Sequence, residues 1–206
     1  MSQEIELKLA VPQALINTVK HHPFWQSYSA SAPKTVQLGN IYFDTADLKL
    51  NQEKVALRIR DIDGEFIQTL KTKGTSHQGI TRRGEWEWQL ASPELDLTLL
   101  KPVWPESLGA INAEQLIPLF STNFHRTKWL LTCEAPYAKI EAALDVGEVR
   151  SGDKSSPISE LELELLEGDE KALEVIAQKL NSELNLKPSD ESKAEKGFNL
   201  LASSRS

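Results

Sequence analysis

The feature that most constrains the fold of this chain is an alternation of charged and apolar residues that recurs along its length. It begins with EIELKL at residues 4–9, where Glu, Glu and Lys alternate with Ile, Leu and Leu. Successive side chains of a β-strand point to opposite faces of the sheet. This segment would therefore form a strand with one charged and one apolar face, and the fold must bury at least one of them.

The same alternation returns in six later segments, where charged residues share one phase and apolar residues such as Leu57, Trp86 and Leu163 take the other. The charged positions are Arg58 and Arg60, Lys71 and Lys73, Arg83, Glu85 and Glu87, Arg126 and Lys128, Glu141 and Asp145, and Glu160, Glu162 and Glu164. Some strands thus carry mainly carboxylates, whereas others carry mainly bases. Arg82 is out of phase with Arg83, so we expect it to point outward.

Turn residues divide the patterned region into eight strands, most of which follow one another directly. Asp63-Gly64 is typical of a tight hairpin turn, and a second hairpin is predicted around Ala135-Pro136. The strands are predicted at residues 3–10, 36–45, 55–61, 65–73, 80–90, 123–134, 138–149 and 158–168. Sequential antiparallel strands of this kind are typical of a closed barrel.

Helical segments are expected around the barrel. Apolar stripes predict helices over 11–21, 169–184 and 189–201, the second with Asp169 as its N-cap. Residues 27–35 are predicted to form a loop, and 91–122 short helices and loops. The fold class is therefore α+β: an eight-stranded antiparallel β-barrel with helices packed outside. We predict one domain over residues 1–206, with strands over about 3–168 and C-terminal helices over about 169–201.

Composition excludes several other classes. The formal net charge of -7 argues against general attraction to nucleic acid, and 40% hydrophobic residues suffice for a core. The lone Cys133 cannot form an internal disulfide, which fits a reducing compartment. No apolar signal segment is visible, and no run approaches the roughly 18 apolar residues that span a bilayer. We expect a cytoplasmic protein that has no membrane partner.

The charged strand faces have two interpretations. In many antiparallel sheets such a face is simply exposed to solvent. If eight strands close, however, one face lines an interior that holds side chains or one small ligand. Charges there cost several kcal/mol per ion unless they are paired or bound by a ligand. Because carboxylates bind Mg²⁺ and bases bind phosphate, we favour a charged tunnel that binds a polyanion with metal.

The segments also resemble a known family. EIELK resembles the ExExK signature of the CYTH domain, also called the triphosphate tunnel metalloenzyme superfamily. The resemblance extends over nearly the whole chain and is closest to the bacterial inorganic triphosphatases. Further segments resemble the family in the same order: NIYFDT, LRIR, TLK, RRGEWEW, FHRTKW, ALDVGEV, ELELELLEG and SKAEKGF.

The resemblance implies an enzyme that hydrolyses inorganic triphosphate to pyrophosphate and phosphate with Mg²⁺ or Mn²⁺. It also implies that a helical CHAD domain can follow the CYTH domain, and these 206 residues do not include one. Relatives include thiamine triphosphatases, RNA triphosphatases and class IV adenylate cyclases. A cyclase, a thiamine triphosphatase and a non-catalytic polyphosphate- or nucleotide-binding module stay open as alternatives, although both acidic pairs are retained and favour catalysis.

Residue roles follow from the same resemblance. The implied metal ligands are Glu4, Glu6, Asp145, Glu160, Glu162 and Glu164. The implied phosphate-binding residues are Lys8, Arg58, Arg60, Lys71, Arg83, Arg126 and Lys193. Catalytic roles are expected for Lys8, Lys71 and Glu85, with Glu85 or Asp145 also able to ligate metal or position water. Lys73 and Lys128 share the phase of their neighbours, but each is equally well explained as an exposed lysine.

Overall fold

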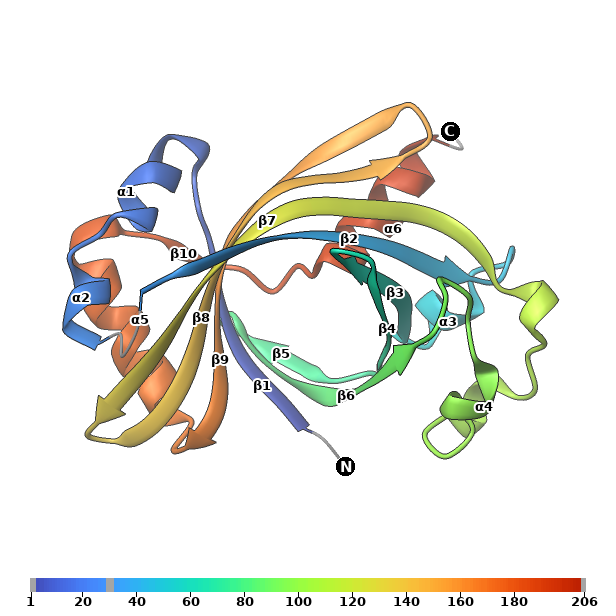
Figure 1. Cartoon of the computed structure of the whole chain (residues 1–206), viewed down its shortest axis with the longest axis horizontal. Helices are drawn as coiled ribbons and strands as arrows, with labels where there is room; N and C mark the ends of the chain where they lie inside the picture. Colours follow the sequence, from blue (N-terminus) through green and yellow to red (C-terminus); the bar gives the residue numbers. More distant parts are fainter. Residues whose placement is uncertain (1–2, 29–31, 205–206) are drawn as a thin grey trace.

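The computed structural model describes residues 3–28 and 32–204, within which ten strands form one antiparallel sheet (Figure 1). Eight of them close into a barrel in the order β1-β9-β8-β7-β2-β3-β4-β6, because β6 also pairs with β1. The barrel strands are β1 (Gln3–Ala10), β2 (Lys34–Asp44), β3 (Ala56–Ile62), β4 (Glu65–Lys71), β6 (Ile80–Leu90), β7 (Ile117–Glu134), β8 (Tyr137–Ser151) and β9 (Lys154–Gly168). This confirms the predicted eight-stranded barrel.

Two short strands and several helices complete the structure. Strand β5 (Thr75–His77) pairs with β6, and β10 (Lys187–Pro188) pairs with the end of β1. The helices are α1 (Ile16–Lys20), α2 (Phe24–Tyr28), α3 (Lys49–Gln52), α4 (Leu97–Leu100), α5 (Lys171–Leu184) and α6 (Lys193–Ser204), with 3-10 turns η1 (Gln13–Leu15), η2 (Glu106–Leu108) and η3 (Ala113–Gln115).

The expected boundaries differ from the observed ones mainly where proline stands inside a strand. Strand β7 starts at Ile117, six residues before the predicted start, and includes Pro118. That residue pairs with Phe43 where the register of β2 and β7 shifts, so the irregular pairing tolerates its missing N–H. The loop predicted at 27–35 is partly wrong, since its ends belong to α2 and β2; residues 29–31 lie outside the described residues.

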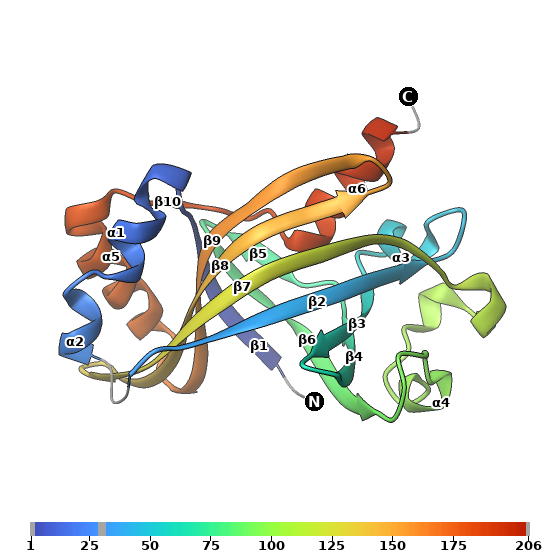
Figure 2. The same ribbon diagram turned by 45° about the horizontal axis from the view of Figure 1, so that its top comes forward.

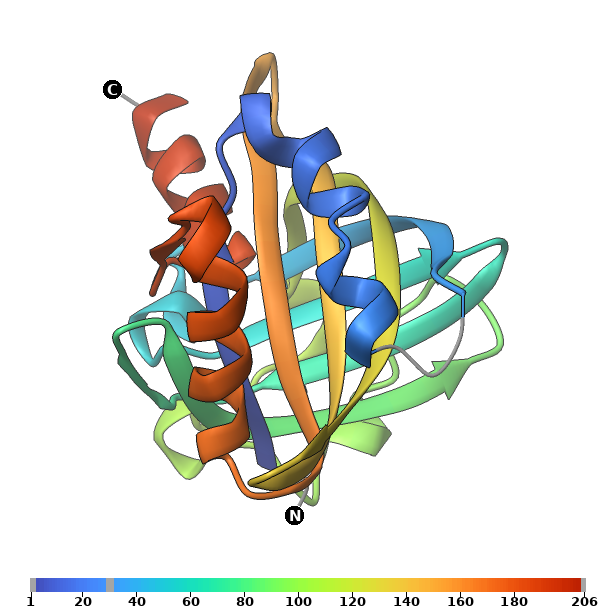
Figure 3. The same ribbon diagram turned by 90° about the vertical axis from the view of Figure 1, so that its left-hand side faces the viewer.

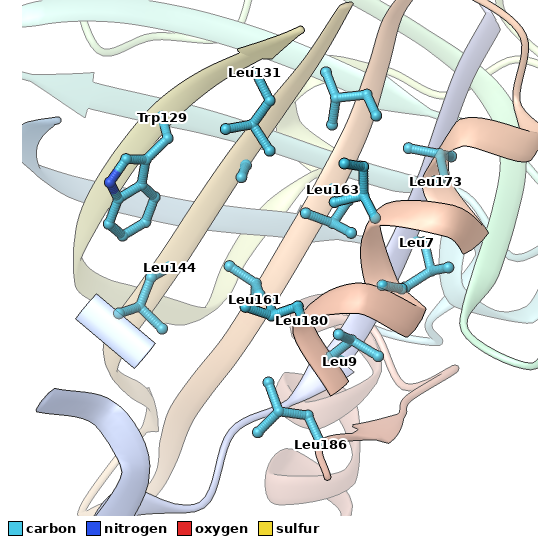
Figure 4. Packing of buried hydrophobic residues seen from close by; sticks show 14 of the residues in the cluster. Leu7, Leu9, Trp129, Leu131, Leu144, Leu161, Leu163, Leu173, Leu180 and Leu186 are labelled. Atoms are coloured by element: carbon cyan, nitrogen blue, oxygen red, sulfur yellow. The ribbon is translucent and has the colours of Figure 1, made fainter. Parts of the chain in front are cut away.

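The largest hydrophobic cluster lies outside the barrel, under α1, α2 and α5 (Figure 3). Leucines from the outward faces of β1 and β9, including Leu7 and Leu163, contact Leu173 and Leu180 of α5 (Figure 4). Trp129 of β7 stacks on Trp25 of α2, with ring centroids 4.2 Å apart. Each such fully buried side chain stabilises the fold by about 1.5–3 kcal/mol. A second cluster covers the outward faces of β3, β4 and β6.

A third cluster departs from the expectation that apolar side chains face only outward. Phe120, Phe124 and Tyr42 pack with Phe198 of α6, and the Arg126 guanidinium lies 5.8 Å from the Phe124 ring. Phe124 is two residues from Arg126, so both point into the barrel. A Cβ on Gly197 would lie 2.1 Å from the Phe120 ring, so α6 reaches this position because residue 197 is glycine. Figure 2 shows α6 beside β8 and β9 at this end of the barrel.

Two polar motifs are explained by local structure. Asp63 and Gly64 have φ values of 53° and 86°, which suit the predicted two-residue hairpin turn between β3 and β4. The carboxylate of the buried Asp44 accepts hydrogen bonds from the backbone N–H groups of Thr45, Leu50 and Asn51. The aspartate of the NIYFDT segment therefore orders the turn into α3 rather than lining the tunnel.

Candidate active site in the tunnel

The barrel encloses a cavity of about 600 Å³ whose lining is mostly charged. Alternation along each strand directs the charged phase inward, as β1 illustrates with Glu4, Glu6 and Lys8 all buried and Leu7 and Leu9 in the outer cluster. Of the predicted site residues, the cavity is lined by Glu4, Lys8, Arg58, Arg60, Lys71, Arg83, Glu85, Arg126, Glu162, Glu164 and Lys193. Glu6, Asp145 and Glu160 are buried just behind this lining, in ion pairs with it.

One side of the tunnel holds an acidic cluster of Asp145, Glu160 and Glu162, built from β8 and β9. Their carboxylate oxygens lie within 4.8 Å of one another. The ammonium of Lys193, at the start of α6, reaches all three, at 2.6 Å from Asp145, 2.5 Å from Glu160 and 2.9 Å from Glu162. Arg126 donates two hydrogen bonds to Asp145, of 2.7 and 2.6 Å, and also pairs with Glu162.

The charges of this first cluster are balanced locally, because Lys196 lies 3.4 Å from Glu160 and brings the number of cations to three. Burial alone would raise the pKa of Glu162, but Lys193 and Arg126 hold it well below its ordinary value. Burial likewise acts to lower the pKa of Lys193, and the three carboxylates reverse this and raise it. Such charge-assisted contacts are strong when buried, and the loss of one partner leaves an uncompensated ion.

A second network joins β1 to β4 and β6. Lys71 lies 2.8 Å from Glu4 and 3.0 Å from Glu85, and Arg83 lies 2.6 Å from Glu4 and 3.1 Å from Glu6. The closing pair of strands determines these contacts, because Glu4 stands opposite Arg83 in the β1–β6 register. Burial alone would raise the pKa of Glu4, but the nearby Lys71 and Arg83 lower it.

Three neighbouring carboxylates on β1, β6 and β9 have raised pKa values, in contrast to Glu4. They are Glu6, Glu85 and Glu164. Glu6 stands directly opposite Glu164 in the β1–β9 register. Burial, followed by repulsion from Glu162 and Glu4, raises the pKa of Glu6. Burial also raises the pKa of Glu85, and burial together with Glu4 and Glu85 raises that of Glu164 to about 7. Within the described residues Glu164 makes no ion pair, so its carboxylate is the one of the three that no cation of the protein contacts.

Two arginines of β3 are short of partners in the same way. The Nε of Arg58 is buried without a hydrogen bond among the described residues, and its guanidinium lies 3.9 Å from Glu85 and from Glu87. Arg60 donates to Asn40 at 3.1 Å, and burial together with Arg58 and Arg126 lowers its pKa to about 10. Burial acts to lower the pKa of Arg58 as well, but Tyr42 and Glu85 raise it. The lowered pKa of Arg60 and the unpaired Nε of Arg58 therefore each favour an anionic ligand.

This arrangement can be compared with known proteins. The sequence profile of the CYTH domain matches residues 2–198. The chain belongs to the CYTH domain family. It is 36% identical over 200 residues to an inorganic triphosphatase of Haemophilus influenzae, covering 96% of this chain and 55% of the relative. The chain thus spans about half the length of that curated relative.

Solved CYTH-like structures share the fold. A putative adenylyl cyclase from Hippeastrum, described as having a dominant triphosphatase activity, superposes with a TM-score of 0.70 at 22% identity, over 98% of this chain and 96% of that one. A putative adenylate cyclase from Bacillus halodurans gives a TM-score of 0.56 at 20% identity, over 93% and 96% of the two chains. At these identities the likeness concerns the fold.

Membership of the CYTH family implies a divalent metal, and the carboxylates of this tunnel fit one. Hard divalent cations prefer carboxylate oxygens. In the first cluster Lys193 already supplies positive charge, whereas Glu164 has no ion pair within residues 3–28 and 32–204, and Glu6 and Glu85 keep raised pKa values despite their pairs with Arg83 and Lys71. Both carboxylate sets therefore offer ligands of the type that a divalent cation prefers, and they differ in whether the Lys193 ammonium already lies among them.

Two residues of the tunnel, Tyr42 and Asn40, lie where the sequence did not indicate a role. Tyr42 of β2 lines the cavity. Burial alone would raise the pKa of its phenol, but Arg58 lowers it and donates a 3.4 Å hydrogen bond to the phenol oxygen. Asn40, in phase with Tyr42, accepts from Arg60. Their inward position could have been predicted, because both stand in the inward phase of NIYFDT, but neither carries the charge that marked the other tunnel residues.

Residues at the edges of the tunnel resolve the open assignments. Arg82 points outward and pairs with Glu170 of the segment before α5, as expected from its phase. Lys128 lines the cavity and pairs with Glu141 at 2.8 Å, whereas Lys73 is exposed beyond the end of β4. Among residues 3–28 and 32–204, no helix has both the length and the apolar character needed to cross a membrane.

Proposed function

We propose that this chain hydrolyses inorganic triphosphate to pyrophosphate and phosphate within the tunnel, with Mg²⁺ or Mn²⁺ as cofactor. The observation that carries the proposal is the presence of two unbalanced charge groups in one cavity. Arg58 and Arg60 lack close carboxylate partners, and Glu164, opposite Glu6, lacks a cation. A polyanion that arrives with a divalent cation supplies both missing charges.

Substrate binding would begin at the two arginines of β3. Guanidinium groups form paired, charge-assisted hydrogen bonds with phosphate oxygens, and Arg58 has a buried N–H ready to donate. Further bases reach the same cavity from other strands and from α6. These are Lys8, Lys71, Arg83, Arg126 and Lys193. We propose that they contact phosphate oxygens by exchanging part of their present carboxylate contacts.

The metal would be held by carboxylates of β1 and β9, chiefly Glu4, Glu6 and Glu164, with Asp145, Glu160 and Glu162 as the second acidic set. When bound, a divalent ion neutralises phosphate oxygens and polarises phosphorus toward attack. The raised pKa values of Glu6 and Glu164 support the first set, because ligation requires the ionised form and a cation supplies the charge that favours it.

The reaction breaks one P–O–P bridge and adds a water oxygen to the terminal phosphorus. We propose that Glu85 accepts the proton of this water, since its raised pKa makes the carboxylate a better base near neutral pH. Lys71 lies 3.0 Å from Glu85, where it orients the carboxylate and can contact the substrate. Lys8, buried beside Glu6, would stabilise charge on the departing pyrophosphate.

One assay separates this function from its alternatives. Purified protein is incubated with triphosphate, ATP or thiamine triphosphate, with and without Mg²⁺, and phosphate and cyclic AMP are measured. We expect metal-dependent phosphate release that is fastest from triphosphate. Formation of cyclic AMP would replace the proposal with a cyclase, preference for thiamine triphosphate would change the substrate, and binding without turnover would indicate a binding module.

The residue roles need their own test. Glu6→Gln keeps shape but removes the charge proposed to hold the metal, so we expect turnover to fall by about 100-fold or more. Glu94→Gln, an exposed carboxylate outside the cavity, is the matched control and should match wild type. Wild-type rates in Glu6→Gln, with the circular-dichroism spectrum unchanged in both variants, would contradict the metal assignment.

Other properties stay predictions. The inorganic triphosphatase relative is longer than this chain, and we propose that a helical CHAD domain can accompany this CYTH domain in the full protein. The cytoplasmic location, the single domain over residues 1–206 and the absence of nucleic-acid binding rest on the sequence. Measuring the size of the natural gene product would test for the additional domain, and fractionation of cells would test the cytoplasmic location.

A further inference from the structure

A second cavity of about 330 Å³ adjoins the tunnel at the side of β5 and the 71–74 segment. Six residues line both cavities: the bases Lys8, Lys71 and Arg83, and the small residues Ala56, Ser192 and Ala194. The charged part of this partition therefore consists of long, flexible bases whose carboxylate partners belong to the tunnel network. A phosphate group bound by those bases would be next to either cavity.

The rim of the second cavity carries two lysines that the proposed hydrolysis does not use. Lys54 and Lys73 are exposed, and in the described part of the chain neither ammonium has a hydrogen bond or an ion pair. A Cβ on Gly74 would lie 2.2 Å from the carbonyl oxygen of Arg82, so glycine allows this segment to lie tightly against β6. That contact fixes the backbone that carries Lys73.

The carboxylates of this cavity are already engaged. Asp190 accepts a 2.8 Å hydrogen bond from the N–H of Gly79, and Glu195 accepts one of 2.8 Å from the N–H of Ser192. Neither forms an ion pair with Lys54 or Lys73. The cavity thus offers unpaired positive charge together with the hydroxyl groups of Thr72 and Thr75 and the mutually hydrogen-bonded pair Ser76 and Thr81, which keeps one hydroxyl hydrogen to donate; this donor set suits phosphate oxygens.

We propose that this second cavity is a phosphoryl-binding subsite, with Lys54 and Lys73 as its charged ligands. The inference rests on the proposed function, because the tunnel reaction supplies the phosphoryl groups that reach the partition. The group bound is either orthophosphate released by hydrolysis or the end of a linear chain longer than triphosphate. Both present the same tetrahedral oxygens, and experiment distinguishes them.

The test compares wild type with the Lys54→Ala/Lys73→Ala double variant. Lys101→Ala/Lys171→Ala is the matched control, since both lysines are exposed, lie outside both cavities and remove the same charge. The first arm measures inhibition of triphosphate turnover by added orthophosphate. If the subsite holds released phosphate, the inhibition constant should rise at least about tenfold in the double variant alone, with uninhibited turnover within about twofold of wild type.

The second arm compares tetraphosphate with triphosphate as substrate. If the subsite holds the end of a longer chain, kcat/KM for tetraphosphate should fall at least about tenfold in the double variant while that for triphosphate is unchanged. A change in either arm supports the subsite. If both quantities stay within about twofold of the lysine control, the subsite does not exist.

A third measurement separates this inference from the proposed function. Orthophosphate is titrated into the metal-free protein by calorimetry. If no triphosphate is hydrolysed but the double variant loses orthophosphate binding that the control retains, the function is wrong and the subsite stands. If hydrolysis proceeds and the double variant binds and responds as the control does, the subsite is wrong and the function stands.

Discussion

The two acidic groups of the tunnel contain similar carboxylates and differ in what balances them. Asp145, Glu160 and Glu162 surround Lys193 and, through Arg126, are held as a compact set of ion pairs. Glu6 and Glu164 face each other across β1 and β9, and both keep raised pKa values. The carboxylates of the first group are matched by cations of the protein, whereas the ionised forms of Glu6 and Glu164 would be favoured further by an added cation.

The difference separates the charged residues of the barrel that stabilise the fold from those that are suited to bind a ligand. Burial of an ion is costly, so a balanced group adds to the integrity of the fold and an unbalanced one subtracts from it. Arg58 and Arg60 of β3 are the corresponding case among the positive charges, because neither has a close carboxylate partner. Variants that remove one partner should therefore affect stability in the first group and ligand binding in the second.

The largest expected effect is the loss of Arg126. Arg126→Met leaves Asp145, which is fully buried, without its paired hydrogen bonds, so the free energy of unfolding should fall by about 3–5 kcal/mol. Arg58→Met, the same substitution at an arginine whose nearest carboxylates lie 3.9 Å away, should change it by less than about 1 kcal/mol. Urea denaturation measures both. Equal losses would abolish the distinction between the two groups.

The next effect concerns the ammonium inside the first cluster. Lys193→Met leaves three carboxylates within 4.8 Å of one another, and we expect it to lower Tm by roughly 6–12 °C, about 3 kcal/mol. Added Mg²⁺ should then raise Tm more in this variant than in wild type, because the ion can replace the lost positive charge. A Tm that responds to Mg²⁺ equally in the two proteins would mean that the lysine does not occupy a cation position.

A smaller effect follows from the titration of Glu164. Its pKa is about 7 in the folded protein and near 4.5 unfolded, so the folded state holds the proton more tightly and stability is lost as pH rises from about 4.5 to 7. Glu164→Gln removes this loss. It should be more stable than wild type by about 1–2 kcal/mol at pH 8, and the gain should disappear near pH 4.

Thermal unfolding across pH tests this prediction, with Glu94→Gln, an exposed carboxylate, as the control. Saturating Mg²⁺ should remove the advantage of the glutamine variant at pH 8, since the cation then stabilises the carboxylate of wild type. A gain that is the same at every pH would show that packing, and not charge, is responsible.

The smallest effect is expected on the outer surface. Arg82 and Glu170 form an exposed pair at 2.9 Å, so Arg82→Ala should lower the free energy of unfolding by at most about 1 kcal/mol and leave turnover unchanged. Its neighbour Arg83 lies inside with Glu4 and Glu6, and Arg83→Ala should lose both stability and activity. Similar behaviour of the two variants would argue against the inward and outward phases assigned to them.

The sequence predicted the barrel and its charged phase because a strand alternates with a period of two, and every charged segment shows it. It predicted the outward position of Arg82 for the same reason. It did not predict which base pairs with which carboxylate. Those contacts depend on the closing registers of β1 with β6 and β9, which join residues more than 70 positions apart, such as Glu4 and Arg83.

The features that the sequence did not predict also have specific causes. Pro118 and Pro157 hid the first residues of β7 and β9, since proline usually marks the end of a strand. The inward face of the barrel was expected to be ionic throughout, but Phe120 and Phe124 meet Phe198 of α6 there. Tyr42 was overlooked because a phenol in an apolar-looking strand carries no charge until the surrounding arginines are known.

The closing seam of the barrel also dictates the order of assembly. Strand β1 is made first, but its partners in the barrel are β6 and β9, and Lys8 stands opposite Glu162 in the last barrel strand. Contacts between such distant residues form slowly, because a long loop must be closed before any of them is gained. A chain emerging from the ribosome therefore carries an unfinished sheet with exposed edges until β9 has been synthesised, and this interval is when it is most vulnerable to aggregation.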